Sequence, residues 1–295
     1  MAHVFVTGLA TLDTIYHLDA LPIGGDKFRA NEAVITGGGG GANAAVTVAR
    51  LGGTASLATR MGQDHIGDMI LAGLEAENVD LSPVHRTATD RSAFSSIYVT
   101  PGGERQVVNF RGEALSGNAE ELQLPQSVDA ALADTRWHAG TARTLDLAKS
   151  RDIPGIVDAE APIDLDQIAA ASHVAFSEQG LIQLTGDTDI LSALKTASHA
   201  IKAWVCVTAG RSGVYCMVKG QIENIPSFEV TASDTLAAGD VWHGAFALKL
   251  AEGADELTSA EFANAAAALK CQHFGGRLGC PNRAETDDLV RHGSR

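Results

Sequence analysis

Residues 234–240 read Asp-Thr-Leu-Ala-Ala-Gly-Asp, and an apolar stretch predicted to be helical, Val241–Leu250, follows them directly. The small residues before Asp240 let a ligand approach the backbone closely, and the first turn of a helix leaves its N–H groups unpaired. Such a helix start can bind phosphate. Asp240 stands where a carboxylate could accept a proton from an alcohol that attacks this phosphate. The alternative is that Asp240 only caps the helix.

A glycine run lies near the amino end. It reads Thr36-Gly-Gly-Gly-Gly-Gly-Ala-Asn43 and opens a helix predicted over Ala42–Leu51. Glycines again permit close contact between backbone and ligand, and Asn43 can both donate and accept hydrogen bonds. A flexible loop is the alternative. No Gly-Lys-Ser/Thr sequence follows, so the run is not a Walker A phosphate loop.

A glycine-containing turn joins two apolar runs in the second half of the chain. Residues 205–215 read Val-Cys-Val-Thr-Ala-Gly-Arg-Ser-Gly-Val-Tyr. This turn could line a nucleotide, although glycines serve more often in a simple β-turn.

Short apolar runs alternate with alanine-rich helical stretches along the chain. The pattern predicts a helix at Ile66–Glu77 and strands at Val4–Gly8, Gly155–Val157, His173–Phe176 and Val205–Thr208. This alternation indicates an α/β fold in which a doubly wound, mainly parallel sheet carries helices on both faces. Ligands of such sheets bind beyond the carboxyl ends of the strands.

Two segments break the alternation. Residues 14–32 have little helical period, and residues 94–110 read as a hairpin that turns at Pro101-Gly-Gly-Glu104. An isolated hairpin is only marginally stable, so the segments need each other or a second subunit. We therefore expect a small β lid from residues 14–31 and 92–112, a core from residues 1–13, 32–91 and 113–295, and a homodimer through the lid.

The composition limits the classes of partner. The formal net charge is −14 at pH 7, and nucleic acid and anionic membranes both repel an acidic surface, so neither is expected as a partner. No apolar run approaches the roughly 20 residues that span a bilayer, and the amino end lacks a secretory signal pattern. The four cysteines show no metal-binding spacing and are interpreted as reduced thiols. We expect a cytoplasmic protein.

The two small-residue motifs, Asp234–Asp240 and the Gly-Gly-Gly-Gly-Ala-Asn sequence that ends at Asn43, together resemble the ribokinase family of carbohydrate kinases, also called PfkB. The likeness extends over nearly the whole chain and includes Gly8, Asp13, residues 60–67, residues 208–213 and Gly275-Gly276. It implies a ribokinase-like fold and an enzyme that transfers the γ-phosphate of ATP to a primary hydroxyl of a small sugar.

The resemblance also implies roles for single positions. Asp240 matches the catalytic base, and the backbone amides of Ala237, Ala238, Gly239 and Asp240 match an anion hole for the transferring phosphate. Positions that hold the sugar are matched by Asp13, Gly38, Gly39 and Asn43. The nucleotide side is matched by Thr208, Gly210, Gly213 and Asn264.

The implied cofactors are ATP and Mg²⁺, with a monovalent cation such as K⁺ as a further candidate. Two positions depart from the family pattern. Glu178, which would organise the waters of Mg²⁺, lies in Phe176-Ser-Glu-Gln-Gly180, where the family has Asn-x-x-Glu. Ala237 stands where glycine is usual, which is tolerable if its φ is negative.

A closer likeness concerns the sulfofructose kinases. Its residues are Asp134-Thr-Arg-Trp-His138, Phe176-Ser-Glu-Gln-Gly-Leu181, and Ala268-Leu-Lys-Cys271 followed by Gly275-Gly-Arg277. In that branch the positions of Lys27, Asn109 and Arg136 handle the sulfonate, which implies an anionic ketose such as 6-deoxy-6-sulfofructose. Without the likeness, Lys27, Arg136 and Arg111 read as ordinary surface charges. Asn43 is closer to the ribokinase pattern than to this branch.

Other functions remain open. Within the family, the substrate could be a neutral ketose, ribose or 2-keto-3-deoxygluconate. A nucleoside is less expected, because Tyr16 and Phe28 are the only candidate stacking partners in the first lid segment. From another class, the chain could be a catalytically silent regulator that binds sugar or nucleotide, but a silent protein would not need Asp240.

Overall fold

A central sheet of eight strands carries the fold. The computed structural model describes residues 1–101, 104–113, 115 and 117–295. The strand order is β14 (Gln221–Ile225), β13 (Val214–Val218), β12 (Trp204–Thr208), β11 (His173–Ser177), β10 (Gly155–Ala159), β9 (Ala130–Asp134), β1 (His3–Thr7) and β4 (Thr54–Ala58). The six strands from β12 to β4 are parallel, and β13 and β14 continue the sheet antiparallel. The predicted α/β fold with a mainly parallel sheet is confirmed.

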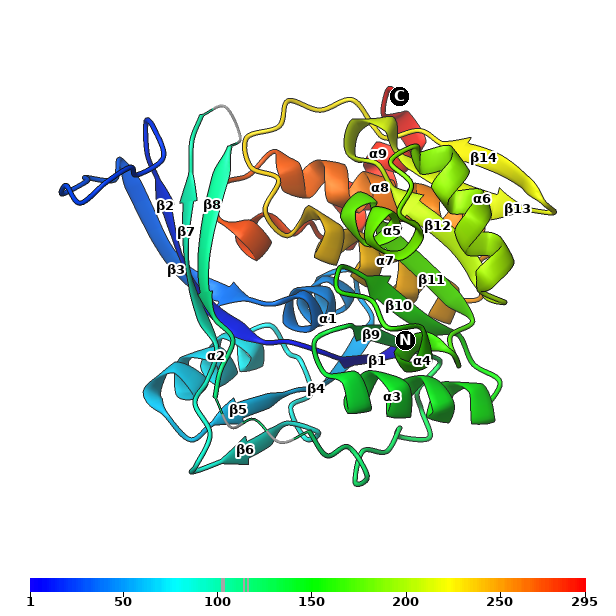
Figure 1. Cartoon of the computed structure of the whole chain (residues 1–295), viewed down its shortest axis with the longest axis horizontal. Helices are drawn as coiled ribbons and strands as arrows, with labels where there is room; N and C mark the ends of the chain where they lie inside the picture. Colours follow the sequence, from blue (N-terminus) through cyan, green and yellow to red (C-terminus); the bar gives the residue numbers. More distant parts are fainter. Residues whose placement is uncertain (102–103, 114, 116) are drawn as a thin grey trace.

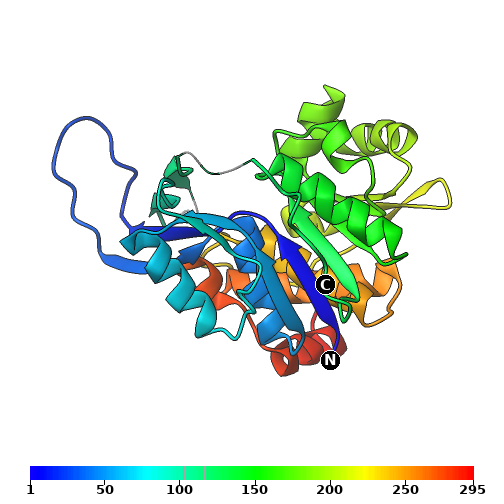
Figure 2. The same cartoon turned by 90° about the horizontal axis from the view of Figure 1, so that it is seen from below.

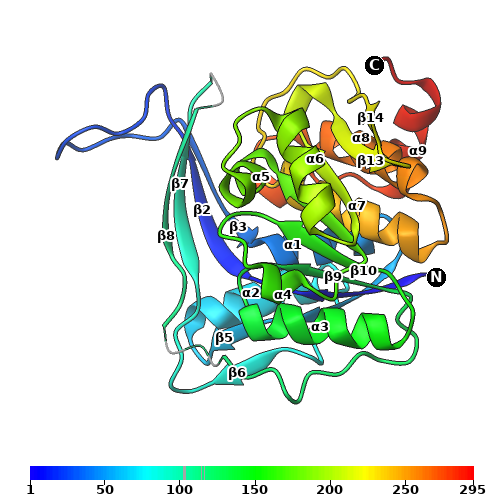
Figure 3. The same cartoon turned by 45° about the vertical axis from the view of Figure 1, so that its right-hand side comes forward.

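Helices cover both faces of this sheet (Figure 1, Figure 3). One face carries α1 (Gly40–Arg50), α7 (Ala238–Ala251) and α8 (Glu256–Cys271), and the other carries α3 (His138–Ser150), α4 (Leu165–Ile168), α5 (Glu178–Thr185) and α6 (Ile190–Ala200). Strand β1 shows why both faces need cover. Its Val4 and Val6 pack in the core with α1 and α7, whereas Phe5 between them packs with α3. Buried strands of this kind are apolar on both sides.

A second sheet of four strands stands beside the main body (Figure 1). Its order is β3 (Glu32–Gly38), β2 (Thr11–His17), β7 (Phe94–Val99) and β8 (Arg105–Phe110). Strands β7 and β8 form the predicted antiparallel hairpin, of whose turn Gly102 and Gly103 lie outside the described residues. Positions 114 and 116, which belong to the predicted core range 113–295, also lie outside the described residues.

The strands of this second sheet do not follow the expected lid boundaries. Residues 11–13 and 32–38, which the sequence placed in the core, are strands of the sheet, whereas residues 18–31 form a projecting loop without strands (Figure 2). Ile15, Val34 and Ile97 pack together on the sheet and fix its register. The loop contains Pro22, Gly24 and Gly25, which do not favour a strand.

The remaining elements border these two sheets. They are α2 (His65–Glu75), α9 (Arg283–His292), the short 3₁₀ helices η1 (Gly210–Ser212) and η2 (Gly276–Gly279), and the two-stranded sheet of β5 (Arg60–Gly62) and β6 (His85–Thr87). Within the described ranges, no helix combines the length and the apolar character needed to cross a membrane.

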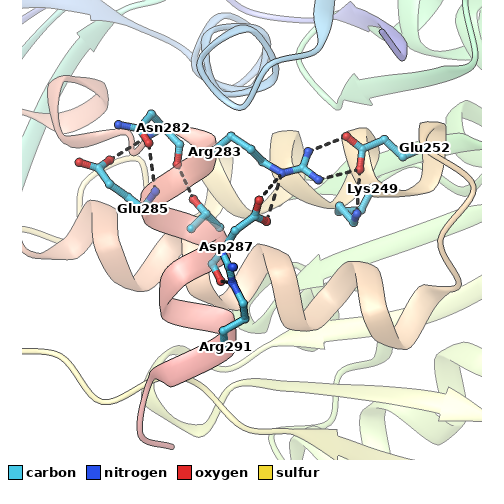
Figure 4. Close-up of polar contacts among 8 residues, drawn as sticks. Lys249, Glu252, Asn282, Arg283, Glu285, Asp287 and Arg291 are labelled. Atoms are coloured by element: carbon cyan, nitrogen blue, oxygen red, sulfur yellow. Dashed lines mark hydrogen bonds and ion pairs between the residues drawn. The ribbon is translucent and has the colours of Figure 1, made fainter.

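Helix α9 is tied to the carboxyl end of α7 by charged side chains (Figure 4). Arg283 Nη1 donates to Glu252 Oε1 at 2.6 Å, and its Nε donates to Asp287 Oδ1 at 3.2 Å. Lys249 adds a bond of 2.7 Å to Glu252 Oε2. Asn282 opens α9 with a capping box, which pairs the first N–H groups of the helix. This network therefore steadies the far end of the helix that begins at Ala238.

Candidate active site

The start of α7 presents Asp240 to a cleft rather than using it as a cap. Ala237 is the N-cap residue and no side chain caps the helix, so Asp240 lies in the first turn with its carboxylate free of the backbone. Asp240 Oδ2 accepts a hydrogen bond of 2.7 Å from Asn43 Nδ2. Asn43 comes from α1, and its Oδ1 is buried without a hydrogen-bond partner in the described part of the chain.

Three backbone amides beside Asp240 are free to bind an anion. The N–H groups of Ala237, Gly239 and Asp240 have no acceptor within the described residues. The amide of Ala238 differs from the expectation, because it donates to Thr235 O at 3.2 Å and is already used. A carbon built on Gly239 would meet nothing within 4 Å, so the space beside these amides is open.

Ala237 is left-handed, with φ 65° and ψ 8°. The condition of a negative φ is therefore not met, and an L-residue in this region costs about 1–2 kcal/mol. The buried carboxylate of Asp234 holds the strained turn, because it accepts from Leu236 N at 2.8 Å and from Gly275 N at 3.0 Å. Strain of this kind persists where the surroundings fix the backbone.

The glycine run is packed rather than flexible. Gly39 has φ 91°, and a carbon added to it would lie 2.4 Å from Leu9 O. A carbon on Gly38 would lie 1.8 Å from Asp13 Oδ2. These positions require glycine because backbone and carboxylate approach them closely. Helix α1 begins at Gly40, which lies inside the glycine run.

Asp134, at the end of β9, joins the glycine run to the sheet. Its Oδ2 accepts from Leu9 N at 2.7 Å and from Gly41 N at 3.1 Å. Its Oδ1 accepts from Arg136 N at 2.9 Å. Burial raises the pKa of this carboxyl, and the amide donors oppose the rise. The carboxylate thus gathers three loops at the carboxyl edge of the sheet.

A cleft of about 480 Å³ lies where the two sheets meet. Its core side includes Asp134, Asp158 and Thr208 from the carboxyl ends of parallel strands, and the second sheet contributes Asp13 and Asn109. Such an edge is where ligands bind in open α/β sheets. The start of α7 and the glycine run both line this cleft, as the sequence predicted.

Carboxylates dominate one wall of the cleft. Burial, together with Asp240, Glu160 and Asp134, raises the pKa of Asp158 to about 7, while His243 opposes the rise. His243 Nε2 lies 3.5 Å from Asp158 Oδ1. The pKa of Asp240 is also raised, mainly by burial, and the hydrogen bond from Asn43 counteracts this. The wall would be stabilised by a cation.

Sequence reasoning did not identify this acidic wall. Asp158 and Glu160 directly follow the predicted strand Gly155–Val157, so their place at a carboxyl strand end was a usable signal. His243 lies three residues after Asp240, a spacing that puts both on one side of a helix. The sequence pointed to Arg277 only through the likeness to the sulfofructose kinases. It is buried, lines the cleft, and lies where a carbon on Gly37 would come within 1.9 Å of its Nη2.

The proposed sugar-side residues divide into two groups. Asp13 is buried at the cleft, Thr11 Oγ1 donates to it at 2.9 Å, and burial raises its pKa. Asn109 and Arg136 line the cleft. Lys27 does not, because it lies exposed on the projecting loop. Position along the sequence could not show how far this loop extends from the core.

Arg136 does not stand in the cleft as a free cation. Its Nη2 pairs with Glu160, and its Nη1 donates to Ala161 O at 2.8 Å. Only 16% of its side chain is exposed. Part of its charge is therefore already balanced within the protein.

Of the four residues expected beside the nucleotide, Thr208 lines the cleft. Gly210 and Gly213 do not, and Gly213 has a local reason, since with φ 85° a carbon on it would lie 2.1 Å from Ile225 O. The nucleotide role of these two glycines stays a prediction. Asn264 is buried, accepts from Trp242 Nε1 at 2.9 Å and donates to Ile225 O at 3.0 Å, so its polar atoms are used structurally.

Glu178 does not reach the cleft. It is the exposed first residue of α5, whereas the preceding Ser177 lines the cleft. No group of three or more histidine, cysteine or acidic residues that could hold a metal occurs within the described ranges.

Known proteins resemble this chain over its whole length. The pfkB family of carbohydrate kinases matches residues 1–283. A ribokinase of Bacillus subtilis is 30% identical over 98% of this chain and 100% of its own length. A solved structure from Agrobacterium tumefaciens is 33% identical with a TM-score of 0.93, covering 98% of this chain and 97% of that one. An Arabidopsis thaliana ribokinase, solved with ribose and ATP, is 22% identical with a TM-score of 0.82, covering 99% of both chains.

The open space at Gly239 gives a test of the free amides. Gly239→Ala adds a methyl group where nothing lies within 4 Å, and alanine favours a helix over glycine by about 1 kcal/mol. The melting temperature should therefore stay constant or rise. Because Gly239 lines the cleft beside the free amides, the added methyl should crowd a phosphate bound there, and ATP affinity measured by calorimetry should fall by about tenfold or more.

The control is Gly117→Ala, which also has nothing within 4 Å of the added carbon and does not line the cleft. It should leave ATP affinity unchanged. Equal ATP affinity in Gly239→Ala and the unmodified protein would show that these amides do not bind phosphate.

Proposed function

The chain belongs to the pfkB family of carbohydrate kinases, and from that membership we propose that Asp240 is the base that lets ATP phosphorylate a primary hydroxyl of a small sugar. The observation that carries the proposal is the placement of Asp240. Its carboxylate is held by Asn43 at 2.7 Å, and Asp240 lines the cleft together with the residues that carry the free amides. A silent regulator would not need a polarised carboxylate in this place.

In the proposed reaction, each part of the cleft has one role. The sugar lies between the glycine run and the second sheet, where Asp13 and Asn43 bind hydroxyl groups. Asp240 accepts the proton of the primary hydroxyl as the hydroxyl oxygen attacks the γ-phosphorus in line, while the bond from that phosphorus to the bridging oxygen breaks and ADP leaves. The amides of Ala237, Gly239 and Asp240 stabilise the negative charge of the transferring phosphoryl group.

The acidic wall fits the Mg²⁺ that would accompany ATP. Mg²⁺ is usually held by one or two carboxylates and by phosphate oxygens rather than by a cage of protein ligands. Asp158 and Glu160 line the cleft, and the charge of Glu160 helps to raise the pKa of Asp158. We propose these two, in place of Glu178, as the residues toward which the ion binds. It would neutralise charge on the phosphates.

The second sheet is proposed to act as a lid and as a dimer contact. Its cleft-facing residues alternate with outward ones, since Thr36 and Asn109 line the cleft and their neighbours Ile35 and Val108 point away. Ile35 is 62% exposed and Val108 59% exposed. A second copy would cover this apolar face, and closure of the cleft face would exclude water.

An anionic ketose, sulfofructose first, is the proposed substrate. Arg136, just after β9, and Asn109, on β8 of the second sheet, both line the cleft, and hydrogen bonds to charged groups are about twice as strong as neutral ones. Lys27 could contribute only if the projecting loop folds over the cleft. Ribose is the second candidate, because Glu160 already balances Arg136 and two of the similar proteins named above are ribokinases.

Asp240→Asn tests the base. The variant keeps the shape of the side chain but cannot accept the proton, so kcat should fall by at least ~100-fold with little change in KM for ATP. The pKa of Asp240 is raised above its usual value, and the base works only when ionised. The kcat of the unmodified enzyme should therefore fall as the pH drops through that raised pKa, and the variant should lack this limb.

The control for that variant is Asp146→Asn, an exposed position on α3. It should leave the pH profile of kcat unchanged. A near-normal kcat in Asp240→Asn would remove Asp240 from the role of base.

Arg136→Ala tests the charge of the substrate. If Arg136 binds the anion, the variant should lose about 2–3 kcal/mol in the transition-state free energy calculated from kcat/KM for sulfofructose. The same change should scarcely affect fructose, which lacks the anion. If the unmodified enzyme prefers ribose or fructose over every anionic sugar, the sulfofructose proposal fails and the kinase assignment stands.

A further inference from the structure

Lys270 is a fully buried lysine behind the phosphate-binding turn. It lies in the last turn of α8 and has no exposed surface. Its Nζ donates to Asp234 O at 2.7 Å and to His273 O at 3.4 Å, and lies 3.2 Å from Asp234 Oδ2. All three partners are oxygen atoms: two carbonyl oxygens accept hydrogen bonds from the ammonium group, and a carboxylate oxygen forms an ion pair with it.

A buried ammonium group is retained only when its surroundings compensate for lost water. Burial lowers the pKa of Lys270, while the charge of Asp234 and the bond to it oppose this. The other charged side chain near the group, Arg105, acts in the lowering direction. A methionine or leucine would fill the same space without this cost, so the charge itself calls for an explanation.

The oxygen partners connect Lys270 to the turn that carries the free amides. Asp234 begins that turn, and its carboxylate also accepts from Gly275 N and Gly276 N at 3.0 and 3.1 Å. The backbone N–H of Asp234 donates in turn to Cys271 O at 3.1 Å. The ammonium group therefore joins the start of the turn to the segment after α8, three residues before the left-handed Ala237.

A free monovalent cation that supported this turn would need several oxygen ligands close to it. The chain does gather such oxygens there, from one carboxylate and two backbone carbonyls, but Lys270 Nζ already binds them. The residues present thus do not fit K⁺ at this place. The expectation of a K⁺ cofactor is not supported by the way the chain arranges these oxygens.

We propose that Lys270 is a positioning residue that supplies a built-in cation, holding the anion-binding turn in place so that the enzyme needs no free monovalent cation. This inference rests on the proposed function of the amides at residues 237–240. The positive charge is fixed at Asp234, where the turn begins. It thereby favours the conformation of the turn in which the free amides point into the cleft.

Two substitutions separate charge from volume. Lys270→Ala removes the ammonium group and leaves space for an ion, whereas Lys270→Met fills the space without charge. With the unmodified enzyme, kcat should be the same in K⁺, NH₄⁺ and tetramethylammonium chloride at constant ionic strength. Both variants should lose roughly 10-fold to 100-fold in kcat in tetramethylammonium, because the phosphate-binding turn is misplaced.

Rescue distinguishes positioning from ordinary packing. K⁺ or NH₄⁺ should increase the kcat of Lys270→Ala several-fold and raise its melting temperature. Neither cation should have either effect on Lys270→Met. A K⁺-dependent kcat in the unmodified enzyme, or a normal kcat in Lys270→Met, would overturn the proposal.

The melting temperatures need no sugar, so they remain informative if the proposed substrate is wrong. Equal melting temperatures of Lys270→Ala in K⁺ and tetramethylammonium would also count against a cation site. If neither variant folds, the salt independence of the unmodified enzyme decides the question.

Discussion

The hydrogen bond of 2.7 Å between Asn43 Nδ2 and Asp240 Oδ2 is the contact on which the site depends. It joins the first turns of α1 and α7, helices whose residues lie almost 200 positions apart in the chain. Both helices can begin at the same cleft only because small residues precede them and let the backbones come close. The contact fixes the carboxylate that we propose as the base.

Two buried carboxylates hold the loops around this contact. Asp134 accepts amide hydrogen bonds from Leu9 and Gly41 beside α1, and Asp234 accepts them from Leu236 and Gly275 beside α7. Each carboxylate accepts from backbone amides and so stabilises a loop conformation, and Asp234 also forms an ion pair with Lys270. This arrangement can hold the strained φ of Ala237, which no local preference would favour.

Local patterns in the sequence predicted much of this structure. Apolar runs identified four of the six parallel strands, β1, β10, β11 and β12, and small residues before helices identified both sides of the cleft, because those signals depend on a few neighbouring residues. What the sequence could not show depends on distant residues. The sequence could not show that Ile225 O fills the turn at Gly213, that Trp242 uses Asn264, or that the loop bearing Lys27 projects from the body.

The claim that the sugar and ATP react in one shared cleft is tested most directly by identifying the product of turnover. Purified protein is incubated with ATP, Mg²⁺ and single sugars, namely sulfofructose, fructose, ribose and 2-keto-3-deoxygluconate, and proton-coupled phosphorus NMR follows the phosphate. A primary hydroxyl carries two protons on its carbon, so phosphorylation there gives a triplet. We predict a new triplet that requires both the sugar and ATP. A doublet from a secondary hydroxyl, or inorganic phosphate released equally with and without sugar, would contradict the account.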